Sequence, residues 1–168
     1  MFETLVLRSI EPSVNSSLID EQHIFRPDRS TGTCTVVFSS FIFDSFLNML
    51  SDTIYTDFTK VFDQVNHNIL IKILSNYDFG EPILSWFSSY LTNRKQFVKL
   101  HDRISNIISN SSGVPQGAIL SMLLFSLLVN SASSVLRHAH LLISAYDMKL
   151  FMRILNENDA SLLLTSIV

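Results

Sequence analysis

Apolar residues return at helical spacing in five stretches of the 168-residue chain. Spacings of three and four residues place such side chains on one face of a helix, so each stretch predicts a helix. The first is expected to end before Pro12, because a proline disfavours helical geometry in the residue that precedes it. Gly80 is expected to stop the third predicted helix, and Pro82 lies at a favoured position in the first turn of the fourth. The five predicted helices cover residues 2–10, 36–50, 68–77, 82–92 and 119–129.

Short segments rich in β-branched and aromatic residues lie between these helices and predict strands. The first strand is expected to carry Asp57 at its end, and the last two form a hairpin with Tyr146 and Asp147 at the bend. No clear pattern follows Arg153. Strands and helices do not alternate as they do around a parallel sheet, so the predicted class is α+β. The predicted strands cover residues 53–58, 96–100, 104–108, 141–143 and 149–151.

The composition is that of a packed domain. Hydrophobic residues make up 47% and charged residues 16% of the chain, whereas soluble domains typically carry about 25% charged residues. Cys34 is the only cysteine, which excludes an internal disulfide and a cysteine-based zinc site and favours an intracellular location. The start, Met1-Phe2-Glu3, does not open a signal peptide with a basic first part and an apolar middle.

Charge taken alone disfavours a nucleic-acid partner. The net charge is −3, and phosphate contacts usually require a basic face. The densest basic patch consists of Arg94, Lys95, Lys99 and Arg103, with Phe97 as a candidate stacking surface. A solvated face of the predicted hairpin is the alternative interpretation of this patch.

A long string at residues 55–67 is the most specific feature of the chain: Tyr-Thr-Asp-Phe-Thr-Lys-Val-Phe-Asp-Gln-Val-Asn-His. It resembles the pattern Tyr-Thr-Asp-Phe-Ser-Lys-Ala-Phe-Asp-x-Val-Asn-His of reverse transcriptases from non-LTR (LINE-like, jockey/CR1-type) retrotransposons. Further stretches continue the resemblance from about residue 2 to residue 155. Residues 21–31 are similar to the fingers motif, and residues 86–94 are similar to the helix after the first palm motif. Two further family motifs are residues 112–117, which read Ser-Gly-Val-Pro-Gln-Gly, and residues 144–147, which read Ser-Ala-Tyr-Asp.

The resemblance implies a right-hand polymerase palm, in which an antiparallel sheet packs on helices. Residues 1–50 would be partial fingers, residues 51–155 the palm with its three polymerase motifs, and residues 156–168 an unassigned tail. The thumb would be absent and the chain truncated at both ends. The implied reaction is RNA-templated DNA synthesis by two-metal nucleotidyl transfer, with an RNA template, a DNA primer and deoxynucleoside triphosphates as partners. No obligate protein partner is inferred.

The resemblance also assigns roles to individual residues. Two Mg²⁺ ions would be held by carboxylates, the hard oxygen ligands that this ion prefers, with Asp57 and Asp147 as the catalytic and metal-binding residues. Gly113 and Gly117 are expected to let the backbone approach a nucleotide closely, because glycine has no Cβ. The implied nucleotide-binding residues are Arg26 and Arg29 near the triphosphate, Phe62 beside the sugar 2′ position, and Gln116 and Gly117 against nucleotide and template.

Several departures from the family pattern predict a loss of activity. Tyr146 stands where the family carries the first aspartate of Ala-Asp-Asp. A phenol has a pKa of about 10 and is neutral at pH 7, so one charge and one metal ligand are lost from the site. The expected activity is at or below detection. The other departures are Ile24 and Asp28 in place of fingers-motif glycines, and Ser121 and Met122 in place of the Gly-Pro that follows the Pro-Gln-Gly loop.

Two other functions stay open from the sequence alone. A repurposed, non-catalytic interaction module would bind nucleic acid through Arg26, Arg29, Arg94 and Lys95. A membrane-associated protein would use the uncharged stretch 118–136, which is long enough to span a bilayer. Serine and asparagine residues interrupt that stretch, so a buried helix is favoured and no membrane contact is predicted.

Overall fold

The chain forms two compact units, each with its own buried core. One unit contains Met1–Ile10 and Lys60–Phe125, and is called the loop unit; the other contains Glu11–Thr59 and Ser126–Val168, and is called the sheet unit. The computed structural model describes residues 2–23, 25–46, 50–57, 60–77, 79–136, 139–144 and 147–165.

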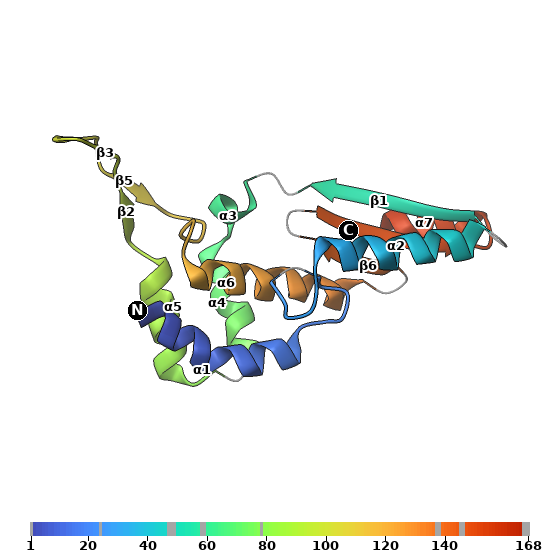
Figure 1. The fold of residues 1–168 in the computed structure, drawn as a ribbon, viewed down its shortest axis with the longest axis horizontal. Coiled ribbons are helices and arrows are strands. Elements are labelled where there is room, and N and C mark those ends of the chain that lie inside the picture. Colours follow the sequence, from blue (N-terminus) through green and yellow to red (C-terminus); the bar gives the residue numbers. More distant parts are fainter. Residues whose placement is uncertain are drawn as a thin grey trace. The chain divides into compact units, whose positions relative to one another are not determined.

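A three-stranded antiparallel sheet forms the centre of the sheet unit (Figure 1). Its strands are β1 (Leu50–Asp57), β6 (His140–Ser144) and β7 (Asp147–Ile154), in the order β1-β7-β6. The central strand β7 pairs with β1 along its whole length, from Leu50 opposite Ile154 to Asp57 opposite Asp147. This register brings the end of the first predicted strand to the start of the last one.

Helix α2 (Thr31–Phe46) covers one face of this sheet and contacts β1 and β6. Phe38 and Phe41 pack edge-on against Phe151 of β7, with ring centroids 5.3 and 4.5 Å apart. Cys34 and Leu142 complete the buried cluster. Aromatic pairs in this arrangement add to the free energy gained by burying their apolar area, so α2 is held on the sheet mainly by its phenylalanines.

The opposite face of the sheet is also buried. Because successive strand residues point to opposite faces, Leu141, Ile143 and Leu150 lie away from α2, and each is almost completely buried. Helix α7 (Glu157–Thr165) contacts β7. The sheet unit therefore has apolar cores on both faces. A short 3₁₀ turn, η2 (Ser131–Val135), also belongs to this unit.

Short helices build the loop unit. They are α3 (Val61–Gln64), α4 (His67–Leu74), the 3₁₀ turn η1 (Ser75–Tyr77) and α5 (Glu81–Leu91). Asn66 begins α4 as its N-cap, since its side chain accepts hydrogen bonds from the backbone N–H groups of Asn68 and Ile69. Leu70, Leu74, Phe87 and Leu91 of α4 and α5 are fully buried in the core of this unit.

Two helices have residues in both units: α1 (Phe2–Ser17) and α6 (Ile119–Asn130). Most α6 residues are buried, Leu120, Leu124 and Leu127 completely so. This agrees with the prediction of a buried helix in the uncharged stretch. None of the helices in the described part of the chain is both long enough and apolar enough to cross a membrane.

The predicted hairpin at residues 96–108 forms as a two-stranded ribbon, interrupted in the middle. Its base is β2 (Arg94–Gln96) paired with β5 (Ile108–Asn110), and its tip is β3 (Lys99–Leu100) paired with β4 (Arg103–Ile104). His101 takes a left-handed conformation at the turn, with φ of 52°. We call residues 94–110 the ribbon.

Several predicted boundaries are wrong. Helix α1 continues through Pro12 to Ser17, because Ile10, Val14 and Leu18 lie at helical spacing and are buried, which stabilises the helix beyond the proline. The second helix starts at Thr31 and ends by Phe46, while Leu50 already belongs to β1. The stretch after Arg153, predicted to lack organisation, contains the end of β7 and all of α7.

Candidate active site

The predicted metal ligands lie directly opposite each other at one end of the three-stranded sheet. Asp57 ends β1, Asp147 begins β7, and the two are partners in the antiparallel register. Residues opposite each other in such a pair have Cβ atoms about 4.5–5.5 Å apart and project to the same face. Both side chains are exposed. Tyr146, the predicted replacement of a third acid, lies outside the described residues.

Like charges placed directly opposite each other destabilise a sheet. A cation bound between these two carboxylates would offset their repulsion. In the described part of the chain, neither carboxylate has a hydrogen bond or a salt bridge from a protein group, and no cluster of three or more histidine, cysteine or acidic residues has metal-binding geometry. The two carboxylates match the hard oxygen ligands of Mg²⁺. They do not by themselves complete a site for two ions.

A cation and a thiol lie near this pair on the α2 side of the sheet. Lys149, two residues beyond Asp147, extends over the rings of Phe38 and Tyr55, with Nζ 5.2 and 5.8 Å from the centroids. Burial raises the pKa of the Cys34 thiol, and the positive charge of Lys149 partly opposes that shift. Lys149 is thus held by aromatic faces.

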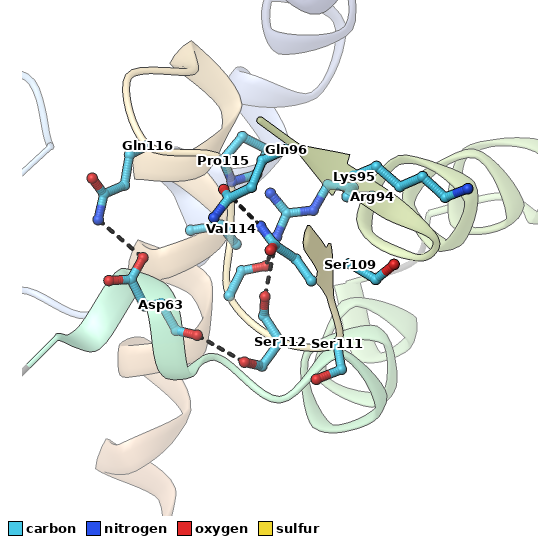
Figure 2. Close-up of a pocket in the computed structure, with 12 residues that line it drawn as sticks. Asp63, Arg94, Lys95, Gln96, Ser109, Ser111, Ser112, Val114, Pro115 and Gln116 are labelled. Atoms are coloured by element: carbon cyan, nitrogen blue, oxygen red, sulfur yellow. Dashed lines mark hydrogen bonds between the residues drawn. The ribbon is translucent and has the colours of Figure 1, made fainter. Parts of the chain in front are cut away.

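In the loop unit, the segment Ser112–Gly117 is bound to α3 by several hydrogen bonds. The backbone N–H of Val114 donates to the Phe62 carbonyl at 2.7 Å, and that of Gly113 donates to the Val65 carbonyl at 2.8 Å. The Ser112 hydroxyl donates to the Asp63 carbonyl at 2.8 Å. Figure 2 shows this contact at the edge of a cavity of about 890 Å³ lined by α3, the ribbon base and the loop.

Gln116, predicted to contact nucleotide and template, is oriented by an acid of the first motif. Its Nε2 donates to Asp63 Oδ1 at 3.0 Å, as Figure 2 shows. Phe62 packs in the same unit against Phe125, with ring centroids 4.9 Å apart. The roles assigned to Phe62, Gln116 and Gly117 by resemblance stay predictions, and the structure adds that Asp63 holds the Gln116 amide.

Glycine is favoured at the two loop positions, 113 and 117, for different physical reasons. A Cβ on Gly113 would lie 2.6 Å from the Phe62 carbonyl oxygen and 2.7 Å from that of Asp63. Close packing of the loop against α3 therefore requires this glycine. The expected approach of the backbone to a nucleotide stays a prediction. Gly117 also has a positive φ, 77°, but a Cβ there would meet nothing within 4 Å. Only Gly117 has open space beside it.

Arg94 and His67 hold the loop from the other side, a role that the sequence did not reveal. Arg94 Nη2 donates to the carbonyls of Ser112 and Gly113 at 3.1 and 2.5 Å, and its Nε donates to that of Leu91 at 3.2 Å. His67 Nε2 lies 2.7 Å from the Gly113 carbonyl oxygen. The sequence signals were the place of His67 inside the long string at residues 55–67 and that of Arg94 at the end of the similar stretch 86–94.

The predicted triphosphate-binding arginines meet at one exposed acid in the sheet unit. Arg26 Nη2 and Arg29 Nη2 lie 3.2 and 3.4 Å from Asp20 Oδ1. Arg26 Nη1 also donates to the Ile19 carbonyl at 2.6 Å. Burial, followed by the charges of Arg29 and Arg26, lowers the pKa of His23, whose Nδ1 lies 2.8 Å from Thr33 Oγ1.

Asp28 shows what the departure from the fingers motif does to the backbone. It has a positive φ of 60°, in the left-handed region that favours the glycine carried there by the family. Aspartate tolerates this region better than most residues, which explains how the turn forms with a side chain present. Ile24, the other departure in this motif, lies outside the described residues.

Comparisons with known proteins show the family of this chain. The family model for reverse transcriptase (RNA-dependent DNA polymerase) matches residues 2–162. A probable RNA-directed DNA polymerase from the transposon X-element of Drosophila melanogaster is 27% identical over 132 residues, which cover 76% of this chain and 14% of that protein. The expected truncation stays a prediction, as does the division into fingers, palm and tail.

Solved structures show the same fold. Apo telomerase from Candida tropicalis, truncated from its C-terminal domain, matches 98% of this chain with a TM-score of 0.73 and 16% identity. Telomerase from the same organism in complex with a fragment of telomeric RNA matches 99% of it with a TM-score of 0.66. The chain spans 36% and 29% of those two chains. The α+β fold is thus that of a polymerase palm, and the chain belongs to the reverse transcriptase family.

Proposed function

We propose that this chain is the palm region of a reverse transcriptase from a non-LTR, LINE-like retrotransposon of the jockey/CR1 type. Its inherited reaction is RNA-templated DNA synthesis from a DNA primer and deoxynucleoside triphosphates, inside the cell where these substrates occur. Family membership and the pairing of Asp57 with Asp147 at the sheet end carry this proposal. The relative from a transposon supports the subtype.

Reverse transcriptases normally use divalent metal ions, and bound Mg²⁺ would supply charge neutralisation for the attacking and leaving oxygens of phosphoryl transfer. In this chain Asp57 and Asp147 would hold the metal, because they project together into solvent at the end of the sheet. Arg26 and Arg29 would bind the triphosphate, with Phe62 beside the sugar. Gln116 and Gly117 would meet the nucleotide and the template.

We further propose that the chain is catalytically impaired. A site with two carboxylates and Tyr146 carries one negative charge fewer than the family's triad, so it binds a pair of divalent cations weakly. Tyrosine is also larger than the aspartate it replaces. Both effects act on the metal site.

A primer-extension assay tests this function directly. The chain as it stands should extend an RNA-templated primer at or below detection, and Tyr146→Asp should raise the product above it. Tyr146→Asn is the matched control, because it removes the ring without adding a charge. Asp57→Asn in the Tyr146→Asp background should abolish the gain. Equal extension by the parent and Tyr146→Asp would contradict the proposed impairment.

A non-catalytic nucleic-acid-binding module is the second candidate, and the structure sharpens which residues would serve it. Arg94 donates to three backbone carbonyls, and Arg26 and Arg29 share Asp20. Lys95 is exposed on the ribbon. Binding without catalysis would therefore depend on Lys95 and the ribbon residues after it more than on Arg26, Arg29 and Arg94.

A further inference from the structure

The ribbon is the most exposed ordered feature of the loop unit. Every residue from 95 to 109 is exposed, on both faces of the two short ladders. A two-stranded hairpin without packing partners is at best marginally stable in water. The ribbon nevertheless carries six large apolar side chains that are 52% to 70% exposed: Phe97, Val98, Leu100, Ile104, Ile107 and Ile108. A surface of this kind is typical of an interaction site.

The charge of the ribbon identifies the kind of partner. Residues 94–110 contain four of the 12 lysine and arginine residues and one of the 15 acids, Asp102, so the ribbon has a charge of +3 in a chain of −3. Among the described residues, Lys95, Lys99 and Arg103 have no salt bridge. Cations left without partners in an acidic chain complement a polyanion.

The base of the ribbon connects it to the loop that carries Gln116. Arg94, the first residue of β2, donates to the carbonyls of Ser112 and Gly113 and so ties the ribbon to that loop. Lys95 and Gln116 line the same polar cavity, together with Gln96, Ser109 and Asn110. A polymer lying along the ribbon would therefore continue into the cavity that contains the predicted template contact.

We infer that the ribbon binds single-stranded RNA, with phosphates at Lys95, Lys99 and Arg103 and a base stacked on Phe97. This inference rests on the proposed function for the class of nucleic acid, but it does not require the metal site. Stacking on an exposed ring combined with cations along the backbone is the usual mode of single-strand binding. The aliphatic side chains beside Phe97 would cover the sugar and base faces.

The test is a fluorescence-anisotropy titration of the 168-residue chain with a labelled oligouridine. Lys99→Glu should weaken binding several-fold and reduce the salt dependence of log K by about 0.7, the value for one phosphate contact on a single strand. Lys72→Glu is the matched control, because Lys72 is an exposed cation of α4 in the same unit. It should leave both quantities unchanged.

Phe97→Leu provides a second test that keeps apolar bulk and removes the ring. It should weaken binding about tenfold if a base stacks there. Hydrogen exchange at residues 95–109 should slow when oligouridine is added to the parent chain, which is a readout independent of any variant. Equal affinity of the parent, Lys99→Glu and Phe97→Leu would overturn the inference, as would the absence of binding at low salt.

Other outcomes separate this inference from the proposed function. If Phe97→Leu converts a dimer into a monomer in sedimentation while RNA affinity is unchanged, the ribbon is a self-association surface and the inference is wrong. Primer extension by Tyr146→Asp decides the proposed function independently, and Asp57→Asn should not alter oligouridine binding. If Tyr146→Asp extends the primer while the ribbon variants bind oligouridine as tightly as the parent, the proposed function holds and the inference about the ribbon is wrong.

Discussion

The Pro-Gln-Gly loop and the end of the palm sheet are held in position by different means. The loop is fixed by hydrogen bonds from Arg94 and to the backbone of α3, and by a glycine with no room for a side chain. The two acids at the sheet end are placed by strand register alone, and their charges oppose each other. The loop is thus stabilised by contacts within the protein, whereas at the sheet end we expect a bound cation to offset the repulsion between the two acids.

Replacement of the loop glycines should give the largest effect. Gly113→Ala forces a Cβ against the backbone of Phe62 and Asp63 at a positive φ, which together should cost about 3 kcal/mol of unfolding free energy. Gly117→Ala meets open space and should cost only about 1 kcal/mol, from its φ. Urea denaturation measures both, and equal losses would show that packing against α3 does not hold the loop.

Loss of Arg94, which clamps the loop, should give the second-largest loss of stability. Arg94→Ala leaves the Ser112 carbonyl without its donor and removes one of the two side chains at the Gly113 carbonyl, where His67 remains, and should cost about 2 kcal/mol. Arg94→Lys keeps the charge without the planar fork, so it should recover only part of the loss. Hydrogen exchange of the Gly113 and Val114 amides should quicken in Arg94→Ala, and unchanged exchange would argue against a clamp.

Removal of one sheet-end acid should have a small effect of the opposite sign. Asp57→Asn relieves the repulsion from Asp147 and should stabilise the fold by about 0.5 kcal/mol in the absence of metal. Mg²⁺ should raise the melting temperature of the parent and not that of this variant. Asp52→Asn is the matched control, since Asp52 is an exposed acid of the same strand that faces Met152. A Mg²⁺ effect shared by all three chains would contradict the predicted site.

The smallest effect is a pH dependence confined to the sheet unit. Burial lowers the pKa of His23 below its ordinary value of 6.5, with the charges of Arg29 and Arg26 acting in the same direction and that of Glu21 opposing them. The unfolded state then binds the proton more readily, so stability is full above pH 6.5 and falls as the pH drops below it.

His23→Gln should flatten this dependence in denaturation curves recorded between neutral and mildly acidic pH. His101→Gln, at the exposed turn of the ribbon, should retain it. Protection factors for hydrogen exchange should therefore change with pH in β6 and β7 and stay constant in Ser112–Gly117. An equal change in both segments would contradict a pH effect confined to the sheet unit.

Local patterns predicted much of the fold because they depend on neighbours in the chain. Pro82 near the start of α5, the apolar run of α6 and the strand that ends at Asp57 are all set by residues close in sequence. The prediction was wrong where burial outweighed local preference, as when α1 continued through Pro12. It also missed α7, whose residues show little amphipathic pattern of their own.

The sequence by itself determined the family, through the long string at residues 55–67, and the strand that carries Asp57. It placed Asp147 at a hairpin bend before a strand at residues 149–151, whereas Asp147 is the first residue of β7. Only the tertiary structure decided that Asp57 faces Asp147, that Asp63 holds Gln116, and that Arg94 is a clamp. The physical reason is separation along the chain. Asp63 and Gln116 are 53 residues apart, and no local preference of either residue specifies a contact that long-range packing alone creates.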